Sequence, residues 1–182
     1  MKKARVIITF DCFRNCQGCC NKYGTIMKNA KSLQNITDLK NYDVVMITGG
    51  EPMLYPNKVI DLTKSLKKEN PNIKVYLYTA NHKNAWDLEQ VLQYVDGIQY
   101  SLHSNATGID MDDFQCFQAQ IFTWADVKSF RLYIDQSIKG TVHITPDLWQ
   151  RIEIKPWLTE SQLLAQQPNG LPQEEELFIL QN

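Results

Sequence analysis

Short apolar runs alternate with longer stretches of helical periodicity along most of the 182 residues. Apolar runs bounded by turn-forming residues predict buried strands, and they occupy 5–10, 43–48, 74–79, 97–102, 129–134 and 151–154. Apolar residues spaced three and four apart predict helices, over 37–40, 57–69, 85–94 and 111–127. The dipeptide Asn70-Pro71 marks the end of the second helix, because proline cannot continue it.

This alternation predicts the α/β class, because a strand–helix–strand unit returns the chain to pair its two strands in parallel. Six strands are too few for the closed eight-stranded barrel. The pattern therefore predicts an open, partial (β/α)6 barrel of mainly parallel strands. Ligands of such sheets bind at the carboxyl ends of the strands, so we expect the functional site there.

The pattern weakens after residue 154. Thr159 to Gln162 forms a capping box that predicts a short helix, and the segment 166–172 is predicted to be a linker. The apolar run 177–180 is expected either to add an edge strand or to dock on a partner. We therefore divide the chain into a partial-barrel domain, 1–158, and a C-terminal extension, 159–182.

Composition limits the classes of function. The formal net charge is −1 and the pI is near 6.3, which gives no electrostatic footprint for nucleic acid or an anionic membrane. No apolar run reaches the roughly 18 residues of a transmembrane helix, and the N-terminus lacks the features of a secretory signal. The number of cysteines is odd, and four of the five lie within residues 12–20, which argues against a disulfide framework and for a reducing compartment, the cytoplasm.

Three cysteines follow the first predicted strand: Cys12, Cys16 and Cys19, in a C-x3-C-x2-C spacing. Thiolates at a strand exit face one small volume, and they prefer zinc, copper(I) and iron–sulfur clusters. A [4Fe–4S] cube ordinarily takes four cysteines, so this loop would leave one iron open, as in a catalytic metal site. Structural zinc requires more Cys or His ligands, and the sequence has no second C-x2-C or H-x3-H. Buried, metal-free thiols are the other alternative.

With this spacing the sequence resembles the radical S-adenosylmethionine (radical SAM) enzymes. A second motif of that family, Thr-Gly-Gly-Glu-Pro from Thr48 to Pro52, follows the second predicted strand. The resemblance implies two cofactors, a [4Fe–4S] cluster held by the three cysteines and S-adenosylmethionine (SAM) chelated to the open iron. It also implies the reaction: one electron from the cluster splits SAM into methionine and a 5′-deoxyadenosyl radical, which abstracts hydrogen from a substrate.

The same resemblance implies eight SAM-binding residues at the strand exits. The second motif is expected to bind the ammonium group of SAM, because glycine lets a ligand approach the backbone and proline holds the preceding residue extended. Polar residues at the next two strand exits are expected to hold the ribose and the carboxylate. The ordinary alternatives are a plain loop and a solvated loop histidine. The eight residues are Gly49, Gly50, Glu51, Pro52, Thr79, Asn81, Ser101 and His103.

Gly18 before Cys19, and Asn21 two residues after it, are similar to the activases of anaerobic ribonucleoside-triphosphate reductase. That likeness implies a glycyl radical enzyme as protein partner and an external one-electron donor such as flavodoxin. An alternative within the class is an enzyme that modifies a small molecule or nucleotide, like the deazaguanine synthases. The rival from another class is a non-catalytic iron–sulfur or zinc module, which predicts a fourth protein ligand.

Cys20 and Cys116 are the candidates for such a fourth ligand. The side chain of Cys20 is expected to point away from that of Cys19. Cys116 lies among aromatic residues of the predicted helix 111–127, so we expect a buried thiol in a helix core. The four tryptophans, Trp157 among them, are expected to serve packing.

Overall fold

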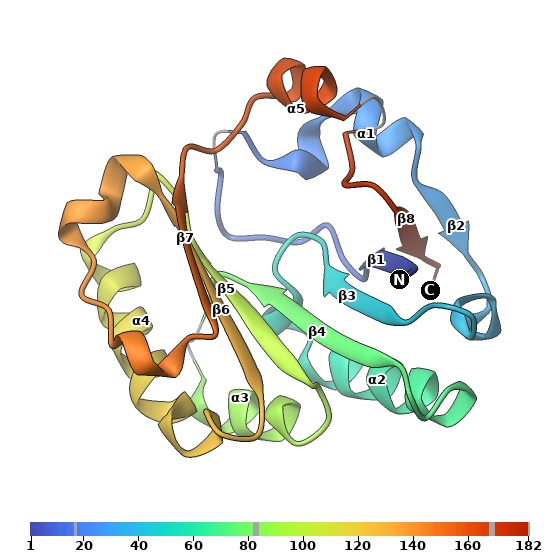
Figure 1. The fold of residues 1–182 in the computed structure, drawn as a ribbon, viewed down its shortest axis with the longest axis horizontal. Coiled ribbons are helices and arrows are strands. Elements are labelled where there is room, and N and C mark those ends of the chain that lie inside the picture. Colours follow the sequence, from blue (N-terminus) through green and yellow to red (C-terminus); the bar gives the residue numbers. More distant parts are fainter. Residues whose placement is uncertain (17, 82–83, 168–169, 182) are drawn as a thin grey trace.

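The computed structural model describes residues 1–16, 18–81, 84–167 and 170–181. Its described residues form one sheet of eight strands in the order β2-β8-β1-β3-β4-β5-β6-β7, and every neighbouring pair is parallel (Figure 1). The strands are β1 (Lys3–Ile7), β2 (Lys31–Leu33), β3 (Val44–Thr48), β4 (Lys74–Thr79), β5 (Gly97–Leu102), β6 (Ser129–Asp135), β7 (Arg151–Lys155) and β8 (Glu175–Leu180).

Three long helices connect the central strands. Figure 1 shows them on the outer side of the curved sheet, where their apolar faces complete the core. They are α2 (Pro56–Glu69), α3 (Ala85–Leu92) and α4 (Gly108–Ile121). Two short helices, α1 (Gly24–Lys28) and α5 (Glu160–Gln166), lie side by side away from them. Single 3-10 turns cover Cys20–Lys22, Ile36–Leu39, Pro52–Leu54, Phe122–Trp124, Gln136–Thr141 and Pro146–Leu148.

The predicted fold class is confirmed. All six predicted strands are present, and the sheet ends at two separate edges, β2 and β7, so it is open. The first strand begins and ends earlier than predicted, at Lys3 and Ile7. Two further strands extend the sheet beyond β1. Strand β2 spans only Lys31–Leu33, and three residues are too few to show a hydrophobic period. The sequence therefore did not indicate this strand.

The C-terminal segment supplies the other additional strand. The apolar run 177–180 belongs to β8, which lies between β1 and β2 and pairs with both, so it is not at an edge. An ion pair between Arg5 and Glu175, with Nε and Oε2 2.6 Å apart, joins β8 to β1. The capping box of Thr159 and Gln162 opens α5, as predicted. The predicted linker 166–172 includes residues 168 and 169, which lie outside the described residues, and the division of the chain at residue 158 stays a prediction.

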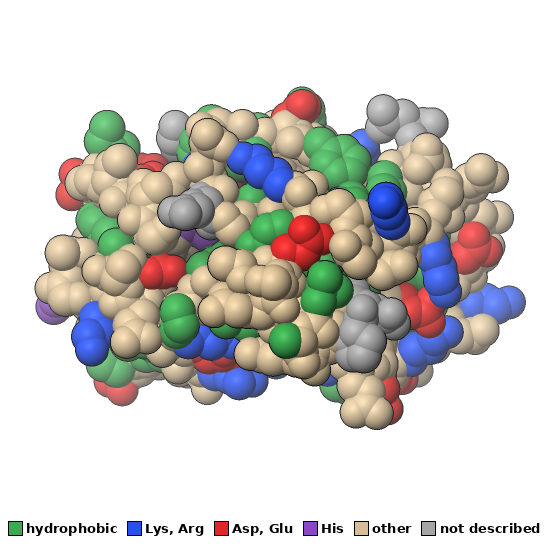
Figure 2. Space-filling model, turned by 90° about the horizontal axis from the view of Figure 1, so that it is seen from above, with side chains coloured by type: hydrophobic (Ala, Val, Ile, Leu, Met, Phe, Trp, Pro, Cys, Tyr) green, Lys and Arg blue, Asp and Glu red, His purple; other side chains and the backbone are tan. Residues whose placement is uncertain are grey.

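The face of the molecule in Figure 2 carries no single dominant charge. On the face shown in Figure 2, Lys and Arg side chains lie scattered among acidic, hydrophobic and other groups. Within the described residues, no helix has the length and apolar character needed to cross a membrane.

Candidate functional site

The cysteine loop and the Thr48–Pro52 segment lie against each other at the carboxyl ends of β1 and β3. The Gly50 amide donates to the Thr9 carbonyl oxygen at 2.7 Å, and the Glu51 amide donates to that of Asp11 at 2.8 Å. The side chain of Asn21 donates to the Gly49 carbonyl. The structure therefore brings the two sequence motifs together, although 28 residues separate Cys19 from Thr48 along the chain.

The two glycines are required by this contact between backbones. Gly49 has φ +136°, and a Cβ there would lie 2.3 Å from the Thr9 carbonyl oxygen. A Cβ on Gly50 would lie 2.1 Å from the carbonyl oxygen of Asp11. Any side chain at either position would force the two loops apart. Glycine is thus required at both positions by the contact between the two backbones, whether or not a ligand is bound.

Glu51 is buried and links this segment to the end of β4 through hydrogen bonds. The residue is 2% exposed, and its carboxylate accepts hydrogen bonds from the Thr79 hydroxyl at 2.6 Å and from the Ala80 and Met53 amides at 3.0 Å. Burial raises the pKa of Glu51, while these bonds and the nearby Arg14 oppose that rise. A carboxylate with three donors holds the segment rigidly.

Asn81 follows at the exit of β4 and is 6% exposed. Its amide donates to the Thr79 hydroxyl at 3.1 Å, but its side-chain oxygen has no hydrogen-bond partner among the described residues. A buried acceptor without a partner costs free energy unless a ligand or water satisfies it. Thr79 and Glu51 bind each other, so Asn81 is the residue of the β4 exit with an acceptor left over.

The three predicted ligands occupy one loop and influence one another. Cys12 is exposed, while Cys16 and Cys19 are half-buried. Burial raises the pKa of Cys16, and the thiols of Cys19 and Cys12 add to that rise; Arg14 and a hydrogen bond from Asn105 oppose it. Within the described parts of the chain, no three Cys, His, Asp or Glu side chains are arranged to hold a single metal ion. In a [4Fe–4S] cube each cysteine binds a different iron.

Arg14 is a site residue that the sequence analysis missed. Its side chain, 7% exposed, leaves the cysteine loop and meets Asp110 of α4, with Nη2 and Oδ1 2.5 Å apart. The same Nη2 donates to the Ala80 carbonyl at 2.8 Å, and Nε has no partner among the described residues. Asp110 is fixed in turn by the capping box with Thr107. An arginine inside the cysteine motif, together with that capping box, was the available signal.

The exit of β5 places His103 beside Trp157, a residue for which the sequence predicts only a packing role. The His103 and Trp157 rings lie 4.2 Å apart. Burial lowers the pKa of His103 to about 4, helped by Arg14 and opposed by Asp135, so the ring is neutral at pH 7. Ser101 is half-buried on β5, two residues earlier, on the same face as alternation predicts.

Cys20 and Cys116 are both exposed. The prediction that Cys116 is buried in a helix core is therefore wrong. Helix α4 buries Phe114, Phe117 and Ile121, and Cys116 falls between these positions on the outward side.

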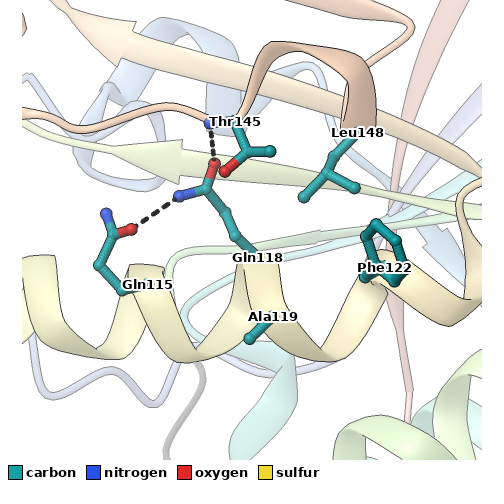
Figure 3. A pocket seen from close by; sticks show the side chains of 6 residues that line it. All are labelled: Gln115, Gln118, Ala119, Phe122, Thr145 and Leu148. Atoms are coloured by element: carbon teal, nitrogen blue, oxygen red, sulfur yellow. Dashed lines mark hydrogen bonds between the residues drawn. The ribbon is translucent and has the colours of Figure 1, made fainter.

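Two clefts among the described residues bear on the location of the site. One, of about 340 Å³, lies along α4 and is lined by Leu148 and by Gln115 and Gln118 (Figure 3). The side-chain amides of the two glutamines are already engaged in hydrogen bonds. The other, of about 470 Å³, lies beside the cysteine loop between Asp11, Tyr55 and the end of β8. The second therefore adjoins the candidate site, and the first does not include any of its residues.

Three cysteines at the exit of the first strand of this open parallel sheet supply thiols, the ligand type that holds iron–sulfur clusters. Residues 4–125 match the family described as "4Fe-4S single cluster domain", and the chain belongs to that family. Its matched part contains all the predicted site residues.

One similar solved structure is "Crystal structure of BtrN in complex with AdoMet and 2-DOIA". It has a TM-score of 0.49 and 17% sequence identity, and the match covers 72% of this chain and 56% of BtrN. This chain therefore spans little more than half the length of that protein. The search of curated proteins found no match.

Proposed function

We propose that this protein is a radical SAM enzyme. The observation that carries the proposal is the packing of the Gly49–Pro52 segment against a three-cysteine loop in a chain of the 4Fe-4S single cluster family. A loop with three thiols leaves one iron of a cube without a cysteine. The rigid segment beside it gives a second cofactor a defined place to bind.

The residues present fit both cofactors. Cys12, Cys16 and Cys19 are thiol donors in one loop, the donor type that iron–sulfur clusters require. The buried side-chain oxygen of Asn81, which has no hydrogen-bond partner among the described residues, is an acceptor suited to a ribose hydroxyl. When bound, the cluster supplies the single electron for reductive cleavage of SAM, the chemistry that yields a radical able to abstract hydrogen from a substrate.

The remaining site residues would orient SAM and exclude water. Glu51 and Thr79 bind each other and hold the segment that would face the methionine part of SAM. His103 is neutral at pH 7, so it would contact the nucleoside without adding charge. Ser101 would present its hydroxyl on the same face of β5.

For the substrate, we propose a backbone glycine of a glycyl radical enzyme. Large apolar side chains are exposed around the two site loops, where such a partner must approach: Phe10, Phe13, Leu54 and Tyr55. A one-electron donor such as flavodoxin would supply the electron. The free cysteines fit a reducing compartment, for which we propose the cytoplasm.

A small-molecule or nucleotide substrate is the second candidate. The cleft of about 470 Å³ beside Asp11 and Tyr55 has a volume typical of ligand sites. A substrate held there would lie next to the cysteine loop.

The test is anaerobic reconstitution of the 182-residue chain with iron and sulfide, followed by incubation with SAM and a reductant. We expect 5′-deoxyadenosine to form. Cys16→Ala should lose both bound iron and product, whereas Cys116→Ala, altered on the outward side of α4, should keep both. Undiminished product from Cys16→Ala would contradict the ligand assignment. A glycyl radical signal from an added candidate reductase would distinguish the two substrates.

A further inference from the structure

Trp157 reaches the cysteine loop from the opposite end of the chain. Its indole Nε1 donates a hydrogen bond to the Gly18 carbonyl at 2.7 Å. Its own backbone amide donates to Asp135 at the end of β6 at 3.1 Å, and its ring packs edge-on against Tyr133 at 4.7 Å. With the His103 ring at 4.2 Å as well, the indole is held on several sides, so the donor is fixed in place.

Gly18 is shaped to receive this bond. It has φ +77°, and a Cβ there would lie 2.8 Å from the Trp157 ring and 3.0 Å from the Tyr23 hydroxyl. Glycine is therefore required both by the backbone conformation and by the approach of the indole. The carbonyl that Trp157 binds belongs to the residue directly before Cys19 and two after Cys16, so the hydrogen bond acts between two of the predicted ligands.

Two neighbouring contacts fasten the same segment to the chain that follows the cysteines. The Tyr23 hydroxyl donates to the Leu158 carbonyl at 2.8 Å, and the Thr25 amide donates to the Glu160 carboxylate at 2.8 Å. We call residues 157–160 the C-terminal strap. It runs from β7 at one edge of the sheet toward α5, and so it crosses the carboxyl ends of the strands where the site lies (Figure 1).

We propose that Trp157 is a positioning residue: its indole N–H fixes the Gly18 carbonyl, and thereby holds Cys16 and Cys19 in the conformation that binds the cluster. This inference rests on the proposed function for the identity of the cluster, but the contact itself acts on the thiols with or without iron. It makes the C-terminal strap a part of the site and not an appendage.

The test uses Trp157→Phe, which keeps an aromatic ring but cannot donate a hydrogen bond. Trp149→Phe is the matched control, because Trp149 also donates through Nε1, to Gln118 at 3.3 Å in the buried core, away from the cysteines. In the iron-free protein, alkylation of Cys16 and Cys19 is timed by mass spectrometry. We expect roughly five-fold faster alkylation in Trp157→Phe only, the change that the loss of one hydrogen bond of ordinary net strength produces.

A second readout uses the reconstituted protein. Trp157→Phe leaves the Gly18 carbonyl without its donor inside the ligand loop, so its partial negative charge disfavours an added electron. We expect a lower midpoint potential and an altered electron paramagnetic resonance (EPR) spectrum of the reduced cluster, and neither change in Trp149→Phe. Tyr23→Phe, which removes only the bond to Leu158, should accelerate alkylation less and serves if Trp157→Phe does not fold.

The proposal is overturned if Trp157→Phe and Trp149→Phe have equal alkylation rates and equal midpoint potentials. It is also overturned if the alkylation rates of Trp157→Phe and Tyr23→Phe both equal that of the wild-type chain. These results are separate from a failure of the proposed function. A wild-type chain that takes up no cluster would remove that function, while the alkylation rates would still decide the role of Trp157.

Discussion

The buried ion pair between Arg14 and Asp110 gives a sharp prediction for Asp110→Asn. The two side chains are 7% and 12% exposed, so neither charge is well solvated. Asparagine retains an oxygen that can accept from the Thr107 amide, which Asp110 Oδ2 accepts at 2.7 Å, so the helix cap is largely kept. What is lost is the counter-charge of a buried guanidinium, whose remaining hydrogen bond is to the Ala80 carbonyl.

Breaking a buried pair by removing one partner costs ~3–5 kcal/mol, because the other charge stays buried without compensation. We expect the free energy of unfolding of Asp110→Asn, measured by urea denaturation, to fall by about 3 kcal/mol, the lower end of that range, since the helix cap at Thr107 is largely kept. Asp112→Asn is the matched control: it makes the same chemical change on an exposed side chain of the same helix, where surface substitutions stay within ~0.5 kcal/mol.

A second substitution, Arg14→Met, tests whether the unpaired cation causes this loss of stability, because it removes that cation. The double variant Arg14→Met/Asp110→Asn should be more stable than Asp110→Asn alone, with a coupling of ~1–3 kcal/mol between the two positions. If the losses in unfolding free energy of the two single variants simply add, or if Asp110→Asn is as stable as Asp112→Asn, the reasoning is refuted. In that case the ion pair between Arg14 and Asp110 does not hold the cysteine loop on α4.

Gly50→Ala should separate the two loops and abolish iron uptake, because its Cβ would lie 2.1 Å from a carbonyl oxygen, whereas Gly108→Ala, with nothing within 4 Å, should be tolerated; equal iron content in both would contradict the account. Glu51→Ala should cost ~3 kcal/mol in urea denaturation by leaving buried donors unpaired, and an unchanged midpoint would count against the tie to β4. The pKa of His103 is lowered from 6.5 to about 4. The unfolded chain therefore binds the proton first, and stability should fall by up to ~3 kcal/mol as pH drops from 6.5 to 4. His103→Phe should flatten that part of the stability profile; an unaltered profile would show that His103 does not carry it.

Local patterns were enough to predict most of the sheet. The runs that became β3 to β7 are bounded by turn residues, and the two motifs follow strands, so parallel pairing alone predicts that they share one end of the sheet. The apolar run in β8 was found, but its place between β1 and β2 depends on pairing with strands far away in the sequence.

The residues that were missed act over long sequence separations. Arg14 meets Asp110 and Trp157 meets Gly18, and neither contact has a local period or spacing that would reveal it. Cys116 was misplaced because aromatic neighbours suggested a buried face, although only their own positions on α4 point inward. The close approach that requires glycine at positions 49 and 50 is made by the backbone at Thr9 and Asp11, and the binding of SAM by these glycines stays a prediction.

The central claim is that three thiols hold a cube whose remaining iron is free to bind SAM. The most direct measurement is the EPR spectrum of the reduced, reconstituted protein with and without SAM, at known iron content. We predict about four irons per chain and a spectrum that shifts when SAM is added. A spectrum indifferent to saturating SAM, with the iron fully loaded, would contradict the account.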